Sequence, residues 1–252
     1  MIPIRDENPT AHPPIVTGVL IVANLVVWGW LQGFGLGSAL PASLCTHALI
    51  PGELLGMAGD GARIAVSESL TCRLGGAGDP ATLLWHMFMH GGWMHLLGNL
   101  WFLWIFGDNV EDVMGPVRFV LFYLLCGLAA AGAQIASSPA SLVPMVGASG
   151  AIGGVMGAYA RLYPRARVHM LVLFGFIVTT VSVPALFVLG YWFLLQIVAG
   201  LPSLGDAVGG VAFWAHAGGF LAGLALSFIL VRDDLLDARR RRPLRQAERS
   251  WF

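Results

Sequence analysis

The sequence predicts an all-α protein whose helices cross a membrane several times. Of its 252 residues, 57% are hydrophobic and only 11% are charged, and the mean hydropathy is +0.75. One soluble core of this size cannot hide so much apolar surface. The apolar residues also fall into six segments, which glycine, proline and polar residues separate. These segments cover residues 15 to 31, 93 to 106, 117 to 136, 148 to 162, 168 to 200 and 211 to 231.

The first segment, residues 15 to 31, is expected to be a retained membrane anchor. The residues before it include Arg5, Asp6 and several prolines. They lack the basic start, short apolar stretch and small-residue cleavage site of a signal peptide. We therefore expect residues 1–14 to be a short cytoplasmic N-terminus, followed by a membrane domain over residues 15–231.

A long polar and glycine-rich loop follows, from residue 33 to about residue 90, and we expect it on the outer side. It contains Cys45 and Cys72, whereas the third cysteine, Cys126, lies in the third apolar segment. Two cysteines in an oxidising compartment can form a disulfide. Two free thiols are also compatible with the sequence, so the pairing stays open.

The fourth segment, residues 148 to 162, is too short to cross a membrane completely. A helix of this length extends about 22 Å, whereas the hydrocarbon core is about 30 Å thick. If Arg161 and Arg165 hold its inner end at the cytoplasmic surface, Ser149 at its outer end lies below the other surface. The preceding stretch SSPASLVPMVG has two prolines and no helical pattern. Irregular backbone is tolerated at depth only where protein or water covers it, so we expect a water-filled cavity that opens to the outer face.

The fifth segment, residues 168 to 200, is long enough for one crossing or two short ones. Arg161, Arg165 and Arg167 place the turn between the fourth and fifth segments in the cytoplasm. The Arg-rich tail, residues 232–252, places the end of the sixth segment there too. Only one crossing satisfies both, so we expect six spans with both termini cytoplasmic. Val168 to about Ser182 is then partly interfacial or bent near Pro184. The tail directly follows an apolar span, which favours a membrane flank over a nucleic-acid site.

Strongly polar side chains inside the apolar segments indicate a functional site. His95 and Asn99 share one face of the second helix because they are four residues apart. Ser149 stands in GASG of the fourth segment and His216 in AHAGGFLAG of the sixth. Such groups are costly in membrane spans and are more often functional than decorative. Glycine-rich ridges on the fourth and sixth helices permit close approach, which would bring Ser149 and His216 within hydrogen-bond reach.

These residue types suit nucleophilic catalysis. A serine hydroxyl needs a base, and a neutral imidazole is the usual one. The site has no obvious buried carboxylate to orient the imidazole, which favours a Ser149–His216 dyad over a triad. The backbone N–H of Ser149 and the side chains of His95 and Asn99 are candidate oxyanion donors. Each residue alone is also compatible with a packing role, and Ala151 breaks the GxSxG pattern of α/β-hydrolases.

The stretch WHMFMHGGWMH contains three closely spaced histidines, His86, His90 and His95. A metal site is one interpretation of this spacing. The sequence has no HExxH, no nearby carboxylate pair and no thiolate cluster. We therefore expect a polar network at the membrane edge, with no metal and no cofactor.

Three stretches in this order, HMFMHGGWMHLLGNLWFLWIFGDNVEDVMG, VGASGAIGG and WAHAGGFLAG, resemble the rhomboid family of intramembrane serine proteases, in its bacterial six-helix type. The resemblance covers roughly residues 80 to 231. It implies a six-helix membrane core, with Ser149 as the nucleophile and His216 as the general base. It also implies that His95 and Asn99 donate hydrogen bonds to the oxyanion.

The resemblance further implies the substrate class and a gate. Substrates would be single-span or otherwise membrane-anchored proteins, cut near the outer surface within or beside a helix that residues with low helix propensity destabilise. They would enter sideways past the fifth helix and a loop cap. Candidate structural or gate residues are Gly147, Gly150, Glu111 in the GxxxExxxG stretch, Pro184, Trp192 and Phe193.

Two glycines depart from the pattern of some relatives. Gly153 stands where some have an aromatic ring beneath the catalytic histidine, which leaves open how His216 is held. Gly98 stands where some have a bulky residue before the oxyanion Asn99, which would leave the gate looser.

Two other functional classes compete with a protease. An inactive rhomboid-like protein would bind transmembrane segments, but such proteins typically lose the serine or the histidine. A small transporter predicts internal repeats, and the sequence shows none. We expect an integral protein of a bacterial cytoplasmic membrane, because nothing resembles a mitochondrial presequence. The sequence does not indicate an oligomeric state.

Overall fold

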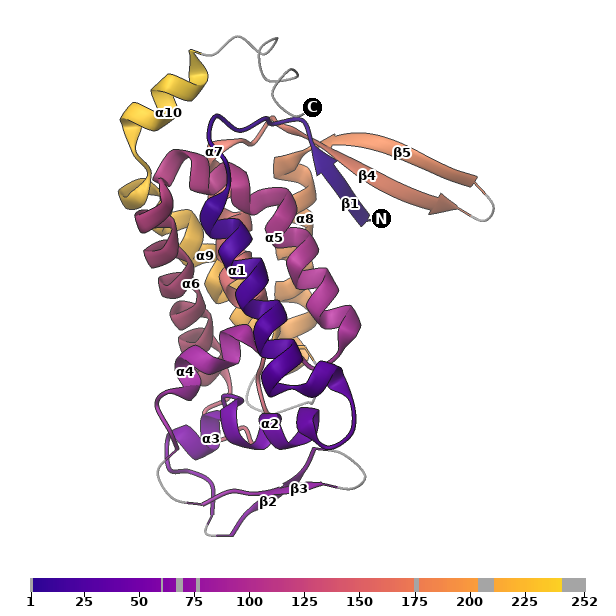
Figure 1. The fold of residues 1–252 in the computed structure, drawn as a ribbon, viewed down its shortest axis with the longest axis vertical. Helices are drawn as coiled ribbons and strands as arrows, with labels where there is room; N and C mark the ends of the chain where they lie inside the picture. Colours follow the sequence, from indigo (N-terminus) through magenta and orange to yellow (C-terminus); the bar gives the residue numbers. More distant parts are fainter. Residues whose placement is uncertain are drawn as a thin grey trace.

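The structure, a computed structural model, describes residues 2–59, 61–66, 70–75, 78–174, 177–203 and 211–241. Figure 1 shows a bundle of long helices with a small sheet near each end. Each long helix corresponds to one of the six apolar segments. They are α1 (Ile15–Val26), α5 (Trp93–Met114), α6 (Pro116–Ser137), α7 (Ser149–Leu162), α8 (Ala185–Gly200) and α9 (Phe213–Leu230).

Two of these helices, α6 and α9, are long and apolar enough by themselves to cross a membrane, among the residues that the structure describes. The apolar helix α1, continued by a π-helical turn at Val27–Leu31, and the apolar helix α8 are shorter. α7 is shorter again, as its sequence predicts. The number of spans therefore depends on how the helices pack and not on their length alone.

Helix α7 lies at the centre of the bundle and packs against α5, α6, α8 and α9. Every residue from Gly150 to Ala160 is buried. A Cβ on Gly219 would collide with the carbonyl oxygen of Gly150, and a Cβ on Gly223 with that of Gly154. The expected close packing of small residues between α7 and α9 is confirmed, and it allows the two backbones to touch.

The second helix is longer than its hydropathy predicts, because α5 continues beyond residue 106 to Met114. Its last two turns carry buried polar residues that bind the chain's N-terminal part. Glu111 accepts hydrogen bonds of 2.8 Å from the N–H groups of Val16 and Thr17 and from the Thr17 hydroxyl. It thereby caps α1, whose first N–H groups have no partner within the helix.

The protein is mostly helical, as expected, but it is not all-α, because two small antiparallel sheets accompany the helices. β1 (Ile2–Asp6), β4 (Arg167–Phe174) and β5 (Ile177–Pro184) form one sheet in the order β1-β4-β5. The fifth apolar segment is thus a strand pair followed by a helix. Its first half is rich in Val, Ile and Thr, which favour strands. α8 begins directly after Pro184, whose missing N–H is no loss at a helix start.

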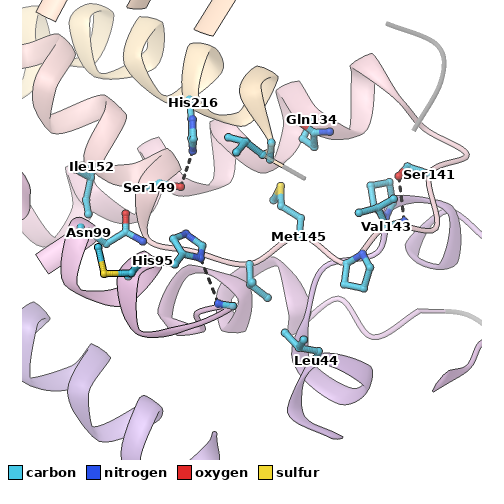
Figure 2. A pocket seen from close by; sticks show the side chains of 18 of the residues that line it. Leu44, His95, Asn99, Gln134, Ser141, Val143, Met145, Ser149, Ile152 and His216 are labelled. Carbon is cyan, nitrogen blue, oxygen red and sulfur yellow. Dashed lines mark hydrogen bonds between the residues drawn. The ribbon is translucent and has the colours of Figure 1, made fainter. Parts of the chain in front are cut away.

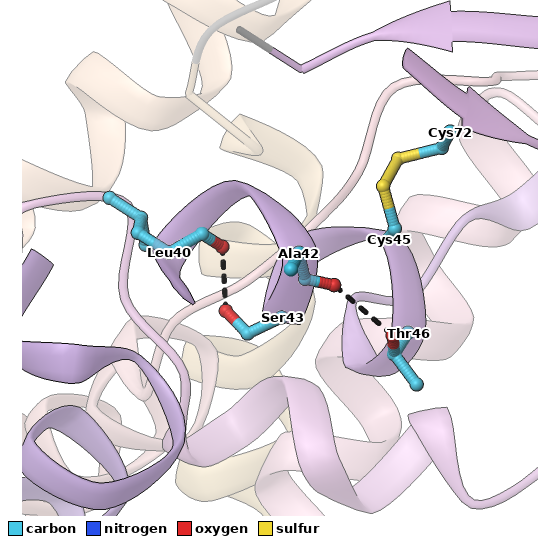
Figure 3. The surroundings of a disulfide bond; sticks show 6 residues. All are labelled: Leu40, Ala42, Ser43, Cys45, Thr46 and Cys72. Atoms are coloured by element: carbon cyan, nitrogen blue, oxygen red, sulfur yellow. Dashed lines mark hydrogen bonds between the residues drawn. A yellow bond between two sulfur atoms is a disulfide. The ribbon is translucent and has the colours of Figure 1, made fainter. Parts of the chain in front are cut away.

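The long loop after α1 is ordered by short elements and a disulfide. Cys45 at the end of α2 and Cys72 in β3 are bonded, with 5.4 Å between their Cα atoms (Figure 3). The bridge resolves the alternatives that the sequence leaves open. The short elements of this region are 3-10 helices at Gly33–Gly35 and His86–Phe88, α2 (Ala39–His47), α3 (Pro51–Leu54), β2 (Arg63–Ala65), β3 (Thr71–Arg73) and α4 (Thr82–Trp85). Another 3-10 turn, Leu201–Ser203, follows α8.

The Arg-rich tail, predicted only as a membrane flank, also contacts the helix bundle. Its helix α10 (Asp233–Arg240) carries Arg239, whose side chain is nearly buried and forms a 3.0 Å ion pair with Asp112. Arg239 also donates to the side chains of Asn8, Tyr163 and Asn109. It therefore joins both ends of the chain to α5 and to the residue after α7. Arg242, Arg245 and Arg249 lie outside the described residues.

Candidate active site

Three helices bring the sequence-predicted site residues to one cavity. α5 supplies His95 and Asn99, α7 supplies Ser149 and α9 supplies His216, and all four line a cavity of about 780 Å³. Figure 2 shows His216 on one side of Ser149 and His95 with Asn99 on the other. The cavity is also bounded by the loop before α7 and by residues of the disulfide-linked region, such as Leu44.

The backbone before Ser149 has a conformation that only glycine adopts easily. Gly147 has φ 130°, in the region that disfavours side chains. Its N–H donates to the carbonyl of His86 over 2.8 Å, and a Cβ on it would approach Nε2 of His95 to 2.7 Å. Gly147 thus ends the irregular stretch and lets the histidine lie beside Ser149, the first residue of α7.

The nucleophile and base candidates are in direct contact. Ser149 Oγ lies 2.7 Å from Nε2 of His216. A neutral imidazole with a free lone pair on Nε2 can accept the serine proton at this distance. The close packing of α7 on α9 produces the contact, because Gly150 and Gly219 leave no side chains between the two helices.

The opposite side of Ser149 offers hydrogen-bond donors. The Nδ1 atom of His95 accepts the N–H of Gly91 over 3.2 Å, so a neutral His95 carries its proton on Nε2, toward Gly147 and Ser149. Asn99 is buried, and its Nδ2 has no hydrogen-bond partner among the described residues. An unpartnered buried donor is costly, which suits an atom that binds the oxyanion of a substrate. The N–H of Ser149 belongs to a first helical turn and has no acceptor within the helix.

One residue of the site was missed by sequence analysis. Gln196 on α8 is buried, and its Oε1 lies 2.8 Å from Nδ1 of His216. The base is therefore contacted by an amide, whereas the sequence pattern suggested only the absence of a carboxylate. The available signal was a single amide in the apolar helix ALFVLGYWFLLQIVAG.

Comparison with known proteins supports the resemblance seen in the sequence. A model of the Rhomboid domain matches residues 77–233 of this chain, which is more than half of it. The chain belongs to the rhomboid family. It is an integral membrane protein, as that domain implies.

Several curated rhomboid proteins are similar to this chain. Rhomboid protease GluP of Bacillus subtilis is 34% identical over 135 residues, 54% of this chain and 25% of the relative. Rhomboid-like protease 5 of Toxoplasma gondii is 29% identical over 162 residues, which are 62% of this chain and 17% of the relative. Rhomboid protein 1, mitochondrial, of Saccharomyces cerevisiae is 27% identical over 171 residues, which are 66% of this chain and 45% of the relative. The chain spans less than half the length of each of these relatives.

The rhomboid match includes all four predicted site residues and excludes the disulfide.

Packing near the site favours a glycine at position 153. A Cβ there would lie 3.0 Å from the carbonyl oxygen of His216 and 3.7 Å from the Trp192 ring. A side chain at position 153 would therefore be tightly packed, and the ring of Trp192 from α8 lies against His216, with 5.7 Å between the ring centroids.

The other gate candidates lie in different places. Phe193 stacks on Phe220 of α9 with ring centroids 4.7 Å apart, whereas Trp192 lines the cavity. Pro184 lies at the far end of α8, beside Tyr163 and Arg165. These positions make Trp192 the candidate closest to the site.

The remaining histidines of this region do not gather with the site as metal ligands. Within the described parts of the chain, no three His, Cys, Asp or Glu side chains come together in a metal-binding arrangement. His86 and His90 are buried, and no ring nitrogen of either has a hydrogen-bond partner among the described residues. The His90 ring lies edge-on to that of His95, 5.2 Å between centroids.

Proposed function

We propose that this rhomboid-family protein is a serine endopeptidase that cleaves membrane-anchored proteins within or next to their transmembrane helices. The observation that carries the proposal is the 2.7 Å contact between Ser149 Oγ and His216 Nε2 at a cavity. Donors from His95 and Asn99 face the same serine. The names of similar proteins, among them two rhomboid proteases, support this activity.

The mechanism proposed for this site proceeds through an acyl-enzyme. Ser149 Oγ attacks the carbonyl carbon of the scissile peptide bond while His216 Nε2 takes the hydroxyl proton. The resulting oxyanion accepts hydrogen bonds from His95, Asn99 and the N–H of Ser149. When the C–N bond breaks, His216 gives the proton to the leaving amine, and the acyl group remains on Ser149 as an ester. Water, deprotonated by His216, then hydrolyses this ester and restores the serine.

We propose six spans, with both termini in the cytoplasm and the cavity opening to the outer face of a bacterial cytoplasmic membrane. Arginines of β1, β4 and α10 lie at one end of the bundle, and among the described residues only Arg63 and Arg73 lie at the disulfide end. The positive-inside rule favours a cytoplasmic location for the first end. A disulfide at the other end agrees with an oxidising outer compartment.

The proposed substrates are single-span or otherwise anchored membrane proteins that enter past α8. A substrate helix must unwind locally before its carbonyl can reach Ser149, so residues of low helix propensity near the cut favour cleavage. Trp192 lines the cavity from α8 and is the proposed gate residue. The bilayer is the route of entry.

Purified protein in detergent, tested on a fluorescent transmembrane substrate, provides the direct experiment. We expect cleavage by the parent protein and none by Ser149→Ala or His216→Ala. Ser137→Ala and His169→Ala are matched controls, because both residues lie outside the cavity, and they should cleave normally. Equal cleavage by all variants would contradict the proposed dyad. Absence of cleavage with several substrates would favour a rhomboid-like protein that only binds transmembrane segments.

A further inference from the structure

Helix α8 contributes one buried polar side chain to the core. Gln196 is 9% exposed, and its neighbours in sequence, Leu194, Leu195, Ile197 and Val198, are all apolar. A buried amide without partners is costly, and polar groups within membrane spans are more often functional than decorative. Both ends of this amide have partners, and the identity of those partners fixes its orientation.

The orientation of the Gln196 amide follows from hydrogen-bond chemistry. Its Nε2 donates to the carbonyl oxygen of Trp192 over 3.2 Å, one helical turn earlier. A carbonyl can only accept, so the NH2 end of the amide must face Trp192. The Oε1 end then faces α9, where it lies 2.8 Å from Nδ1 of His216.

This orientation selects one tautomer of the histidine. Because Oε1 of Gln196 can only accept, Nδ1 of His216 must carry a proton. A neutral imidazole has one proton, so Nε2 keeps its lone pair, and this atom lies 2.7 Å from Ser149 Oγ. The other tautomer would direct an N–H at the serine and could not accept its proton.

We propose that Gln196 is a positioning residue for the catalytic base, holding His216 in the one neutral tautomer that can deprotonate Ser149. This inference rests on the proposed function and extends it. Gln196 takes the place that a carboxylate occupies in a Ser-His-Asp triad, but it supplies orientation without charge. The ring of Trp192 lies against the His216 ring, so α8 restrains the base in two ways.

The proposal also gives α8 a second role beside that of a cavity wall. Gln196 and Trp192 are one turn apart on this helix, and both contact His216. A displacement of α8 would remove both contacts together. The position of α8 therefore determines whether His216 is held in its working orientation.

The test compares Gln196→Leu and Gln196→Glu with the control Leu195→Ala, which alters an exposed side chain of the same helix. Gln196→Leu is similar in size but cannot accept from Nδ1. We expect kcat to fall roughly 10-fold to 100-fold with KM within about twofold, less than the loss of about 10⁴ in a triad whose orienting carboxylate is replaced. Gln196→Glu keeps an acceptor and should restore most of kcat. Leu195→Ala should match the parent.

A spectroscopic measurement separates positioning from a structural role. Nitrogen-15 NMR of protein labelled at histidine reports the tautomer, and the His216 signals are assigned by their absence in His216→Ala. The parent and Gln196→Glu should show the proton on Nδ1, and Gln196→Leu should show a mixture of tautomers. An unchanged tautomer and an unchanged kcat in Gln196→Leu would overturn this inference while the Ser149 and His216 results still stand. Cleavage by Ser149→Ala would instead overturn the proposed function.

Discussion

Both ends of the helix bundle bury polar side chains, but these side chains differ in whether they have hydrogen-bond partners. At the end with β1 and α10, Glu111 and Asp112 are almost completely buried, and their carboxylates accept hydrogen bonds from N–H groups, a hydroxyl, a histidine and Arg239. At the Ser149 end, Asn99 Nδ2 and the ring nitrogens of His86 have no partner among the described residues. Buried polar groups are normally satisfied. The partners of Glu111 and Asp112 therefore indicate a structural role, whereas the unpartnered groups near Ser149 agree with the proposed binding of a substrate there.

The largest effect on stability is expected from removing the hydrogen bonds of Glu111. Glu111→Ala leaves the N–H groups of Val16 and Thr17 without an acceptor, and each unsatisfied buried group costs about 1 to 3 kcal/mol. We expect the protein to lose roughly 3 kcal/mol or more of stability, measured by thermal unfolding in detergent. Glu111→Gln keeps one acceptor oxygen and should lose less. Equal losses in the two variants would show that the carboxylate does not cap α1.

Removing a polar side chain at the Ser149 end should cost a similar free energy, but the loss should appear in the rate of catalysis and not in the stability of the protein. Asn99→Ala removes a proposed oxyanion donor, and loss of such a donor lowers kcat roughly 10² to 10³-fold. The unfolding temperature should stay within about 2 °C of the parent, because Nδ2 of Asn99 has no partner to lose. A large fall in unfolding temperature would mean that Asn99 serves packing, and would remove the contrast between the two ends.

A disulfide provides a further contrast, because it lies outside the bundle and outside the rhomboid match. Cys45 and Cys72 are 27 residues apart, and closing a loop of that length is worth about 3.5 kcal/mol of stability in the chain-entropy model. In the double variant Cys45→Ser, Cys72→Ser, we expect limited proteolysis to cut the region of α2 and β3 faster. The helix bundle should unfold at nearly the same temperature. Simultaneous unfolding of both parts would show that the outer region supports the bundle.

The smallest effect concerns the carboxylate of Asp6, which lies at the same end of the bundle as Glu111 and Asp112 (Figure 1). Burial raises the pKa of Asp6 from 3.8 to about 6, although Tyr159 donates to its carboxylate and Arg239 lies nearby. Between these two pKa values Asp6 is protonated in the folded protein and ionised in the unfolded chain, so its contribution to stability is complete below about pH 4 and is lost as pH rises from about 4 to about 6. In Asp6→Asn this slope should become shallower in a series of unfolding curves. An unchanged slope would show that other groups account for all of it.

Much of the site could be read from the sequence. Ser149, His216, His95 and Asn99 stand out because each is polar within an apolar segment, and the structure brings all four to one cavity. Gln196 carries the same signal but lacks a partner nearby in sequence. Its contact with His216 joins residues 20 positions apart on different helices.

Three other features could not be predicted from the sequence, because each depends on contacts between distant residues or on a pattern that fits more than one structure. The extension of α5 to Met114 was missed because hydropathy treats Glu111 as a solvated charge, whereas it is a buried cap. The β4-β5 pair was missed because a continuous apolar run shows no periodicity that distinguishes a strand from a buried helix. Arg239 was assigned only to a cytoplasmic membrane flank, since no local pattern shows that Asp112 lies beside it.

The sequence by itself determined the apolar segments, the glycine ridges and the chemical character of the site, because these depend on residue type and spacing. Only the tertiary structure decided which buried polar groups have hydrogen-bond partners and which have none among the described residues. Hydrogen bonds depend on distances between atoms from different helices, such as Ser149 Oγ and His216 Nε2. The disulfide was decided at the same level, because two cysteines pair only when the fold brings their Cα atoms within bonding range.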